Sequence, residues 1–140
     1  MNVCLVGSRS LKVDGDVALH VLAALQAIPG GTVLLRKPLW RPPRSFETLV
    51  STLAASLGLE VRWCVPAPGG RSLVFLRDVE MVQAADEVIA FFPEGEEMTG
   101  GTAHVVEKAL DQKRPVRAYA IQAGAIRLVG SEDWSTEGGS

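Results

Sequence analysis

The fold is decided by residues 84–110, which read AADEVIAFFPEGEEMTGGTAHVVEKAL. The apolar run at 88–92 is typical of a short buried strand. A loop rich in glycine and glutamate follows and closes on Gly100, Gly101 and Thr102, where the sequence predicts the start of a helix. A strand, a glycine loop and a helix N-terminus in this order present backbone N–H groups and the positive end of a helix dipole to an anion.

The chain has 140 residues, the size of one domain with a substantial core. Hydrophobic residues make up 47% of it and aromatic residues 6%, which suits buried parallel strands covered by helices. No apolar run approaches the ~20 residues of a membrane span, and the N-terminus shows no signal-peptide pattern. We expect a cytoplasmic protein without membrane contact, with a single domain at residues 1–130 and a flexible C-terminal tail at 131–140.

Strand-like and helix-like segments alternate along the chain. The expected strands are residues 2–6, 32–35, 60–65, 88–92 and 116–121, and the expected helices are residues 17–28, 46–57, 72–85 and 102–112. We expect Asp16 and Ser45 to cap the first two helices, and Gly58 to end the second. Residues 126–129 could add a short edge strand.

Single helices between successive strands predict a parallel sheet with right-handed crossovers. We therefore expect an α/β, Rossmann-like three-layer domain with a parallel five-stranded sheet in the order 3-2-1-4-5. In this order the connections change direction between the first and fourth strands, and ligands bind in the crevice outside the C-terminal ends of those strands. The loop that begins at Gly7 and the loop that ends at Thr102 meet there.

Both of these loops contain candidate ligand contacts. Gly7 and Ser8 fit an ordinary turn after a strand, and they also fit a close approach of phosphate to the backbone with the Ser8 hydroxyl as a donor. Thr102 is expected to cap its helix, which leaves the other N–H groups of the first turn for a phosphate or carboxylate. No lysine follows Gly100 and Gly101, so this is not a P-loop, and the first loop lacks the full G-x-G-x-x-G pattern.

Four basic residues follow the second predicted strand: Arg36, Lys37, Arg41 and Arg44. They form a solvated face, a ligand lid or a contact surface for another chain, and the interleaved Trp40 is typical of an interface anchor or a stacking platform for a base. The net charge of −2 argues against a surface coated by nucleic acid.

Arg77 lies in the third predicted helix, whose N-terminus faces the same edge of the sheet. It either pairs with Asp78 or Glu80 on the surface or reaches a ligand phosphate, for which bidentate geometry favours arginine.

Three glutamates, Glu94, Glu96 and Glu97, precede the glycine pair. They could hold a sugar hydroxyl, a divalent metal or a catalytic proton, although such a run more often keeps a loop soluble. His104, in the first turn of the next predicted helix, is expected to be an exposed structural residue or a pH-sensitive contact. No Cys/His spacing predicts a metal site, and Cys4 and Cys64 are expected to be buried free thiols.

Four short motifs together resemble one family. They are GSR at 7–9, RDVEM at 77–81, AADEVIAFF at 84–92 and GGT at 100–102. This combination resembles the SLOG superfamily of Rossmann-like nucleotide-binding proteins, and most closely its YspA-like branch. DprA-type and LOG-type domains belong to the same superfamily. The resemblance covers most of residues 2–121.

The resemblance implies site residues. Gly7, Ser8 and Arg9 would line a nucleotide site, Arg77 would face it, and residues 100–102 would take phosphate. The chain also departs from the family pattern. Residues 36–38 read RKP where the family often has a second glycine-rich signature, so cationic side chains stand in for backbone donors or the ligand differs.

A second departure concerns catalysis. The LOG-type hydrolases place a glutamate two or three residues after the threonine of the glycine motif, where this chain has His104 and Val105. Glu107 is out of register. Glycosidic hydrolysis requires a positioned carboxylate, so this departure argues against that activity.

Three functions remain open at this level. The first is a ligand sensor or sequestering module that binds a nucleotide or nucleotide derivative, as a homo-oligomer. The second is a hydrolase or transferase acting on the N-glycosidic bond of a nucleotide, with a glutamate of residues 94–97 as its carboxylate. The third is an accessory factor that contacts protein or single-stranded nucleic acid through Trp40 and its neighbouring arginines, although the acidic balance does not favour nucleic acid.

Overall fold

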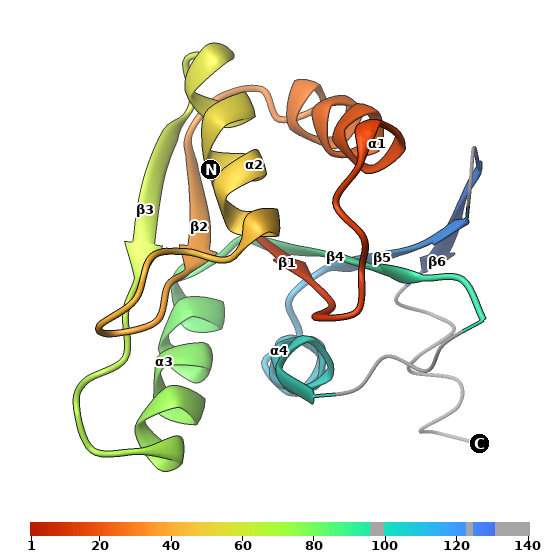
Figure 1. The fold of residues 1–140 in the computed structure, drawn as a ribbon. Coiled ribbons are helices and arrows are strands. Elements are labelled where there is room, and N and C mark those ends of the chain that lie inside the picture. The colour runs from red at the N-terminus through yellow and green to blue at the C-terminus, as the bar shows by residue number, and fades with distance from the viewer. Residues whose placement is uncertain (96–99, 123–124, 131–140) are drawn as a thin grey trace.

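A computed structural model describes residues 1–95, 100–122 and 125–130 of the chain (Figure 1). Within these ranges the strands are β1 (Asn2–Gly7), β2 (Thr32–Arg36), β3 (Glu60–Cys64), β4 (Glu87–Pro93), β5 (Val116–Gln122) and β6 (Ala125–Gly130). The helices are α1 (Gly15–Gln26), α2 (Ser45–Ser56), α3 (Arg71–Ala84) and α4 (Gly100–Asp111). None of these helices is long and apolar enough to cross a membrane.

The six strands form one mixed sheet in the order β3-β2-β1-β4-β5-β6. The first five are parallel, and β6 pairs antiparallel with β5 at the edge. The predicted Rossmann-like α/β fold, the order 3-2-1-4-5 and the additional edge strand are therefore confirmed. Because β1 and β4 are neighbours, the chain reverses its direction of winding between them, as the sequence predicts.

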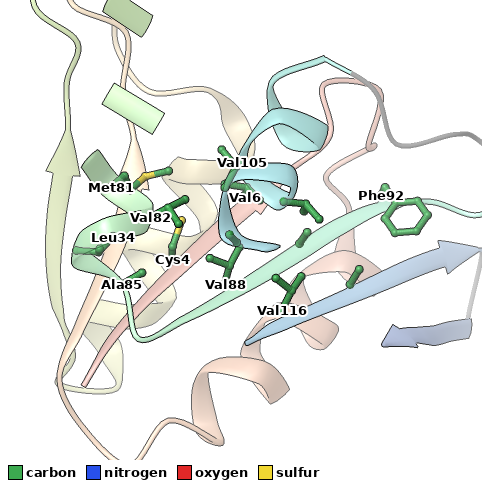
Figure 2. Packing of buried hydrophobic residues seen from close by; sticks show 14 of the residues in the cluster. Cys4, Val6, Leu34, Met81, Val82, Ala85, Val88, Phe92, Val105 and Val116 are labelled. Carbon is green, nitrogen blue, oxygen red and sulfur yellow. The ribbon is translucent and has the colours of Figure 1, made fainter. Parts of the chain in front are cut away.

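Helices cover both faces of the sheet, with α1 and α2 on one side and α3 and α4 on the other (Figure 1). Strand β1 supplies both layers, since Val3 and Leu5 pack under the first pair of helices, whereas Cys4 and Val6 pack under the second. Figure 2 shows the second layer, which contains Met81 and Val82 of α3, Val105 of α4 and side chains from β1, β4 and β5. Burial on both faces explains why β1 lacks polar alternation.

The predicted caps of the first two helices are wrong. Helix α1 begins at Gly15, and its cap is Asp14, whose side chain accepts a hydrogen bond of 3.0 Å from the N–H of Val17. Asp16 lies instead in the first turn, where its negative charge interacts favourably with the positive end of the helix dipole. Helix α2 includes Ser45, and Arg44 occupies its N-cap position without a capping side-chain bond.

Thr102 does not cap α4, because this helix already includes Gly100. Thr102 lies inside the first turn and is 3% exposed. Its hydroxyl oxygen is 3.4 Å from Nη2 of Arg36, so the side chain faces a buried cation and not its own helix end.

Gly7 is required by packing against α2. A Cβ atom at this position would lie 2.6 Å from the ring of Phe46, which is itself 4% exposed. Close approach of an aromatic ring is sufficient to account for this glycine.

We expect Gly7→Ala to lower the free energy of unfolding by about 1–3 kcal/mol, because the Phe46 ring must shift within a packed core. Urea denaturation measures the change. The matched control is Gly15→Ala at the start of α1, where no atom lies within 4 Å of the added Cβ. Its unfolding free energy should stay equal or rise slightly. Equal losses in the two variants would contradict this account.

Cys4 is completely buried in β1, and Cys64 at the end of β3 is half-buried; both are free thiols. Burial disfavours the thiolate and raises the pKa of Cys4 to about 12. The folded protein thus keeps this thiol neutral at a pH where the unfolded chain ionises it.

Stability should therefore fall as pH rises above the ordinary thiol pKa. Between pH 8 and pH 10 the wild-type protein should lose ~1–2 kcal/mol more unfolding free energy than Cys4→Ala, which cannot ionise there. Urea titrations at several pH values give both slopes, and all other titrating groups are common to the two proteins. Parallel slopes would show that Cys4 does not contribute.

Candidate functional site

A cleft of about 890 Å³ opens at the C-terminal edge of the sheet. The loops that follow β1, β2 and β3 form its walls, together with the first residues of α4 and part of α3. This volume lies within the roughly 300–1,000 Å³ range of small-molecule sites. The two predicted ligand loops both reach it, since Ser8 and Arg9 line the cleft opposite residues 100–102. The loops after β2 and β3 extend it beyond the crevice between the first and fourth strands.

Arg36 lies at the floor of this cleft and is 8% exposed. It is the last residue of β2, which places it at the C-terminal edge of the sheet. Nη2 is 3.4 Å from the carbonyl oxygen of Gly7 and 3.4 Å from Oγ1 of Thr102, both long contacts to uncharged groups. Nε is buried without a partner among the described residues. Burial lowers the pKa of Arg36, and the nearby Glu47 opposes that shift.

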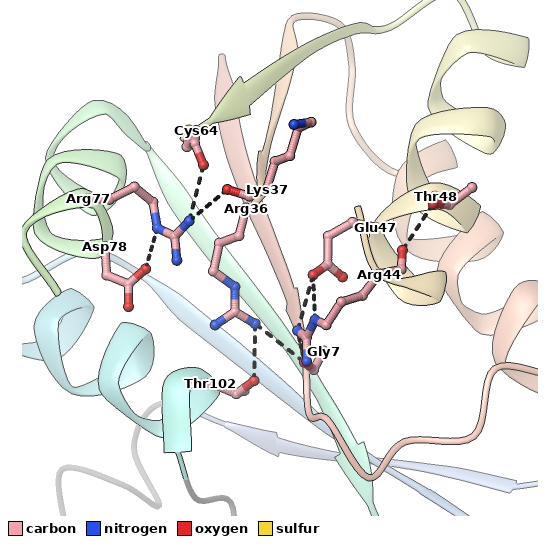
Figure 3. A network of polar contacts seen from close by, with 10 residues as sticks. All are labelled: Gly7, Arg36, Lys37, Arg44, Glu47, Thr48, Cys64, Arg77, Asp78 and Thr102. Atoms are coloured by element: carbon pink, nitrogen blue, oxygen red, sulfur yellow. Dashed lines mark hydrogen bonds and ion pairs between the residues drawn. The ribbon is translucent and has the colours of Figure 1, made fainter. Parts of the chain in front are cut away.

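Two ion pairs flank Arg36, one on each side (Figure 3). Arg44 donates to Oε1 of Glu47 at 3.1 Å, and Arg77 donates to Oδ1 of Asp78 at 2.8 Å. Both carboxylates are buried, with exposures of 2% and 1%. Within the described part of the chain, Arg36 itself forms no ion pair with a carboxylate. The floor of the cleft therefore carries one buried positive charge more than its carboxylates neutralise.

Arg77 lines the cleft, as its predicted role requires, but much of its guanidinium is engaged within the protein. Its Nη1 donates to the carbonyl oxygens of Lys37 at 3.3 Å and Cys64 at 3.2 Å, while Nε binds Asp78. These bonds fasten the ends of β2 and β3 to α3. Arg77 thus holds the wall of the cleft in place.

His104 pairs with the same carboxylate from the other side. Its Nδ1 is 3.1 Å from Oδ2 of Asp78, and its ring lies 4.5 Å from the ring of Phe75. Asp78 therefore joins α3 to α4 through two partners. His104 lies in the second turn of α4, its side chain is 18% exposed, and it does not line the cleft.

The glycines at the start of α4 leave space for the side chain of Arg36. A Cβ atom at Gly101 would lie 2.8 Å from Nη1 of Arg36, so this position leaves room for the guanidinium. Gly100 has a φ of +66°, a conformation that favours glycine. The glycine pair thus brings a cation and a helix N-terminus to the same point, and Nη1 forms no hydrogen bond to any described residue.

The loop after β1 offers fewer backbone N–H groups to a ligand than the sequence predicts. The N–H of Ser8 donates to the carbonyl of Phe91 at 2.9 Å, which removes it as a ligand donor. The Ser8 hydroxyl lies 3.0 Å from that of Ser10. Arg9 is exposed at the rim of the cleft.

The predicted basic cluster is not a single surface. Arg36 is buried, Lys37 and Arg44 are half-buried in the cleft wall, and Arg41 is exposed outside the lining. Trp40 is 85% exposed and lines the rim.

Glu94 lies outside the cleft. Its carboxylate binds Arg127 of β6 at 3.1 Å and lines a separate small hollow beside β5 and β6. Glu96 and Glu97 fall outside the described residues. Among the residues that are described, no group of three or more His, Cys, Asp or Glu side chains could hold a metal ion.

Sequence reasoning missed Glu47. A signal was present, because Glu47 falls on the same helical face as Val50 and Ala54, which are both buried. A carboxylate on an apolar face beside the binding edge of a sheet marks a buried polar contact.

No protein-family model matches the chain, and no curated protein matches it. The resemblance to the SLOG superfamily therefore stays a prediction that depends on the short motifs.

We expect Glu47→Gln to lower the unfolding free energy by about 2 kcal/mol, because Arg44 loses its carboxylate and Arg36 loses the negative charge that most offsets its burial. The control is Glu60→Gln at the exposed start of β3, with an expected change below about 0.5 kcal/mol. Urea denaturation compares the two variants. A similar small change in both would mean that Glu47 does not balance these cations.

Proposed function

We propose that the cleft binds a phosphate-bearing small molecule of the nucleotide class, and that the protein acts as a ligand sensor or sequestering module. The observation that carries this proposal is Arg36, a guanidinium 8% exposed that lacks a carboxylate partner among the described residues. An isolated buried charge costs several kcal/mol, and a bound anion would offset that cost.

The charges around the cleft support an anionic ligand. Among the described residues, five cationic side chains line it: Arg9, Arg36, Lys37, Arg44 and Arg77. The two described carboxylates of the lining, Glu47 and Asp78, each bind an arginine. The N-terminus of α4 adds the positive end of a helix dipole beside Nη1 of Arg36. Planar guanidinium groups suit the oxygens of phosphate.

The resemblance to nucleotide-binding SLOG proteins supports the same ligand class. Its motif residues Ser8, Arg9 and Arg77 line the cleft together with residues 100–102. The site of the proposed ligand thus coincides with the site that the family motifs imply.

The geometry of the described residues favours binding without turnover. A hydrolase of the predicted kind needs a carboxylate beside the sugar. Among the described residues, Glu94 lies outside the cleft and binds Arg127, and the two carboxylates that line the cleft, Glu47 and Asp78, are held by arginines. Glu96 and Glu97 lie outside the described residues.

The test is a melting experiment with inorganic phosphate, ribose 5-phosphate and nucleoside 5′-monophosphates. A ligand at 100 times its Kd should raise the melting temperature of the wild-type protein by about 5–10 °C. Arg36→Met should abolish this rise, yet leave the unliganded protein equally or more stable, because the buried charge is gone. Arg62→Met, on the exposed face of β3, is the matched control and should keep the full rise.

Two results would contradict the proposal. The first is the absence of any shift with phosphate compounds in the wild-type protein. The second is an equal shift in Arg36→Met, which would place the ligand elsewhere. Release of free base during incubation with a nucleoside monophosphate would favour the hydrolase instead.

A further inference from the structure

Two aromatic side chains are exposed in the described part of the chain, and both line the cleft. Trp40 is 85% exposed and Phe75 is 42% exposed. The other aromatic side chains of the described ranges are buried or half-buried. Large aromatic surface left in water is unfavourable, and its place here, at the mouth of a cleft with a cationic floor, points to a ligand that covers it.

The loop that carries Trp40 is fastened at both ends. At its start, the N–H of Lys37 donates to the carbonyl of Cys64 at 3.1 Å, and the carbonyl of Lys37 accepts from Arg77. At its end, Arg44 binds Glu47 and donates to the carbonyl of Gly7 at 3.2 Å. Prolines at 38, 42 and 43 restrict the backbone between these anchors. The indole is therefore presented by a restrained loop, which lowers the entropy lost on stacking.

The cleft has two chemically different ends. Its floor holds the guanidinium of Arg36 beside the start of α4. Its less buried lining is largely apolar: Pro38, Leu39 and Trp40 contribute from the loop after β2, Pro68 from the loop after β3, and Phe75 from α3. A ligand that fits both ends carries phosphate at one end and a flat apolar ring at the other.

We propose that Trp40 is the ring-binding residue of the cleft and that it selects a phosphate monoester bearing a planar heterocycle over a plain sugar phosphate. This inference rests on the proposed function, because the phosphate at Arg36 fixes the position of the ring. A terminal phosphate reaches a buried cation at the floor more easily than an internal phosphodiester of a long strand does. The ligand is therefore a free mononucleotide-like compound and not single-stranded nucleic acid.

The test compares the affinities of adenosine 5′-monophosphate and ribose 5-phosphate by calorimetry. Stacking of a base on an aromatic side chain should make the nucleotide bind about 5- to 100-fold more tightly to the wild-type protein. Trp40→Ala should reduce this ratio to within about threefold, with the affinity for ribose 5-phosphate unchanged, whereas Trp40→Phe should keep most of it. The control is Leu19→Ala on α1, which removes an exposed apolar side chain away from the cleft and should keep the full ratio.

The outcomes separate this inference from the proposed function. If Trp40→Ala keeps the wild-type ratio, or if the wild-type protein binds both compounds equally, Trp40 does not bind the ring. Loss of binding in Arg36→Met would then still support the phosphate site. If neither compound binds the wild-type protein, both proposals fail. A single-stranded oligonucleotide that binds more than tenfold tighter than the mononucleotide would overturn the small-molecule ligand and favour a nucleic-acid partner.

Discussion

The cleft depends on one constraint, the placement of the Arg36 guanidinium at the C-terminal end of a buried parallel strand. A cation in such a position needs space and polar neighbours, and the surrounding chain supplies both. Gly101 leaves room because a Cβ there would lie 2.8 Å from the guanidinium. The Gly7 carbonyl and the Thr102 hydroxyl accept from it at 3.4 Å. Two segments distant in sequence, one at Gly7 and one at residues 101–102, thus converge on one side chain.

Two arginine–carboxylate pairs reduce the energetic cost of burying the Arg36 charge. Arg44 with Glu47 and Arg77 with Asp78 place buried negative charge on either side of Arg36 without neutralising it directly. The same pairs hold the cleft walls, because Arg77 fastens β2 and β3 to α3, and Asp78 also binds His104 of α4. Hydrogen bonds and ion pairs thus hold the walls of the cleft, and one buried positive charge remains at its floor, an arrangement that supports the proposed anionic ligand.

The structure gives the glycines at positions 7 and 101 a different explanation from the one that the sequence suggests. In the sequence, Gly7 and Gly101 both suggest close approach of a ligand to the backbone. In the folded chain Gly7 makes room for the ring of Phe46, and Gly101 makes room for Arg36. A missing side chain shows that something approaches closely, but the sequence does not identify it. The division of the cleft into a charged floor and an aromatic mouth likewise depends on the folded chain, in which the loops after β2 and β3 line the same cleft.

The sequence by itself determined the α/β alternation, the order of the five parallel strands and the edge at which the candidate site lies, because these follow from local periodicity and from chain connectivity. It suggested a sixth, short edge strand, and the structure showed that this strand is antiparallel. Only the tertiary structure decided which side chains meet. Arg36 and Thr102 are 66 positions apart, and no local pattern pairs them. It also moved Glu94 out of the site and brought Glu47 into it. Hydropathy reports that a residue is polar, whereas burial and charge balance depend on neighbours that only folding brings together.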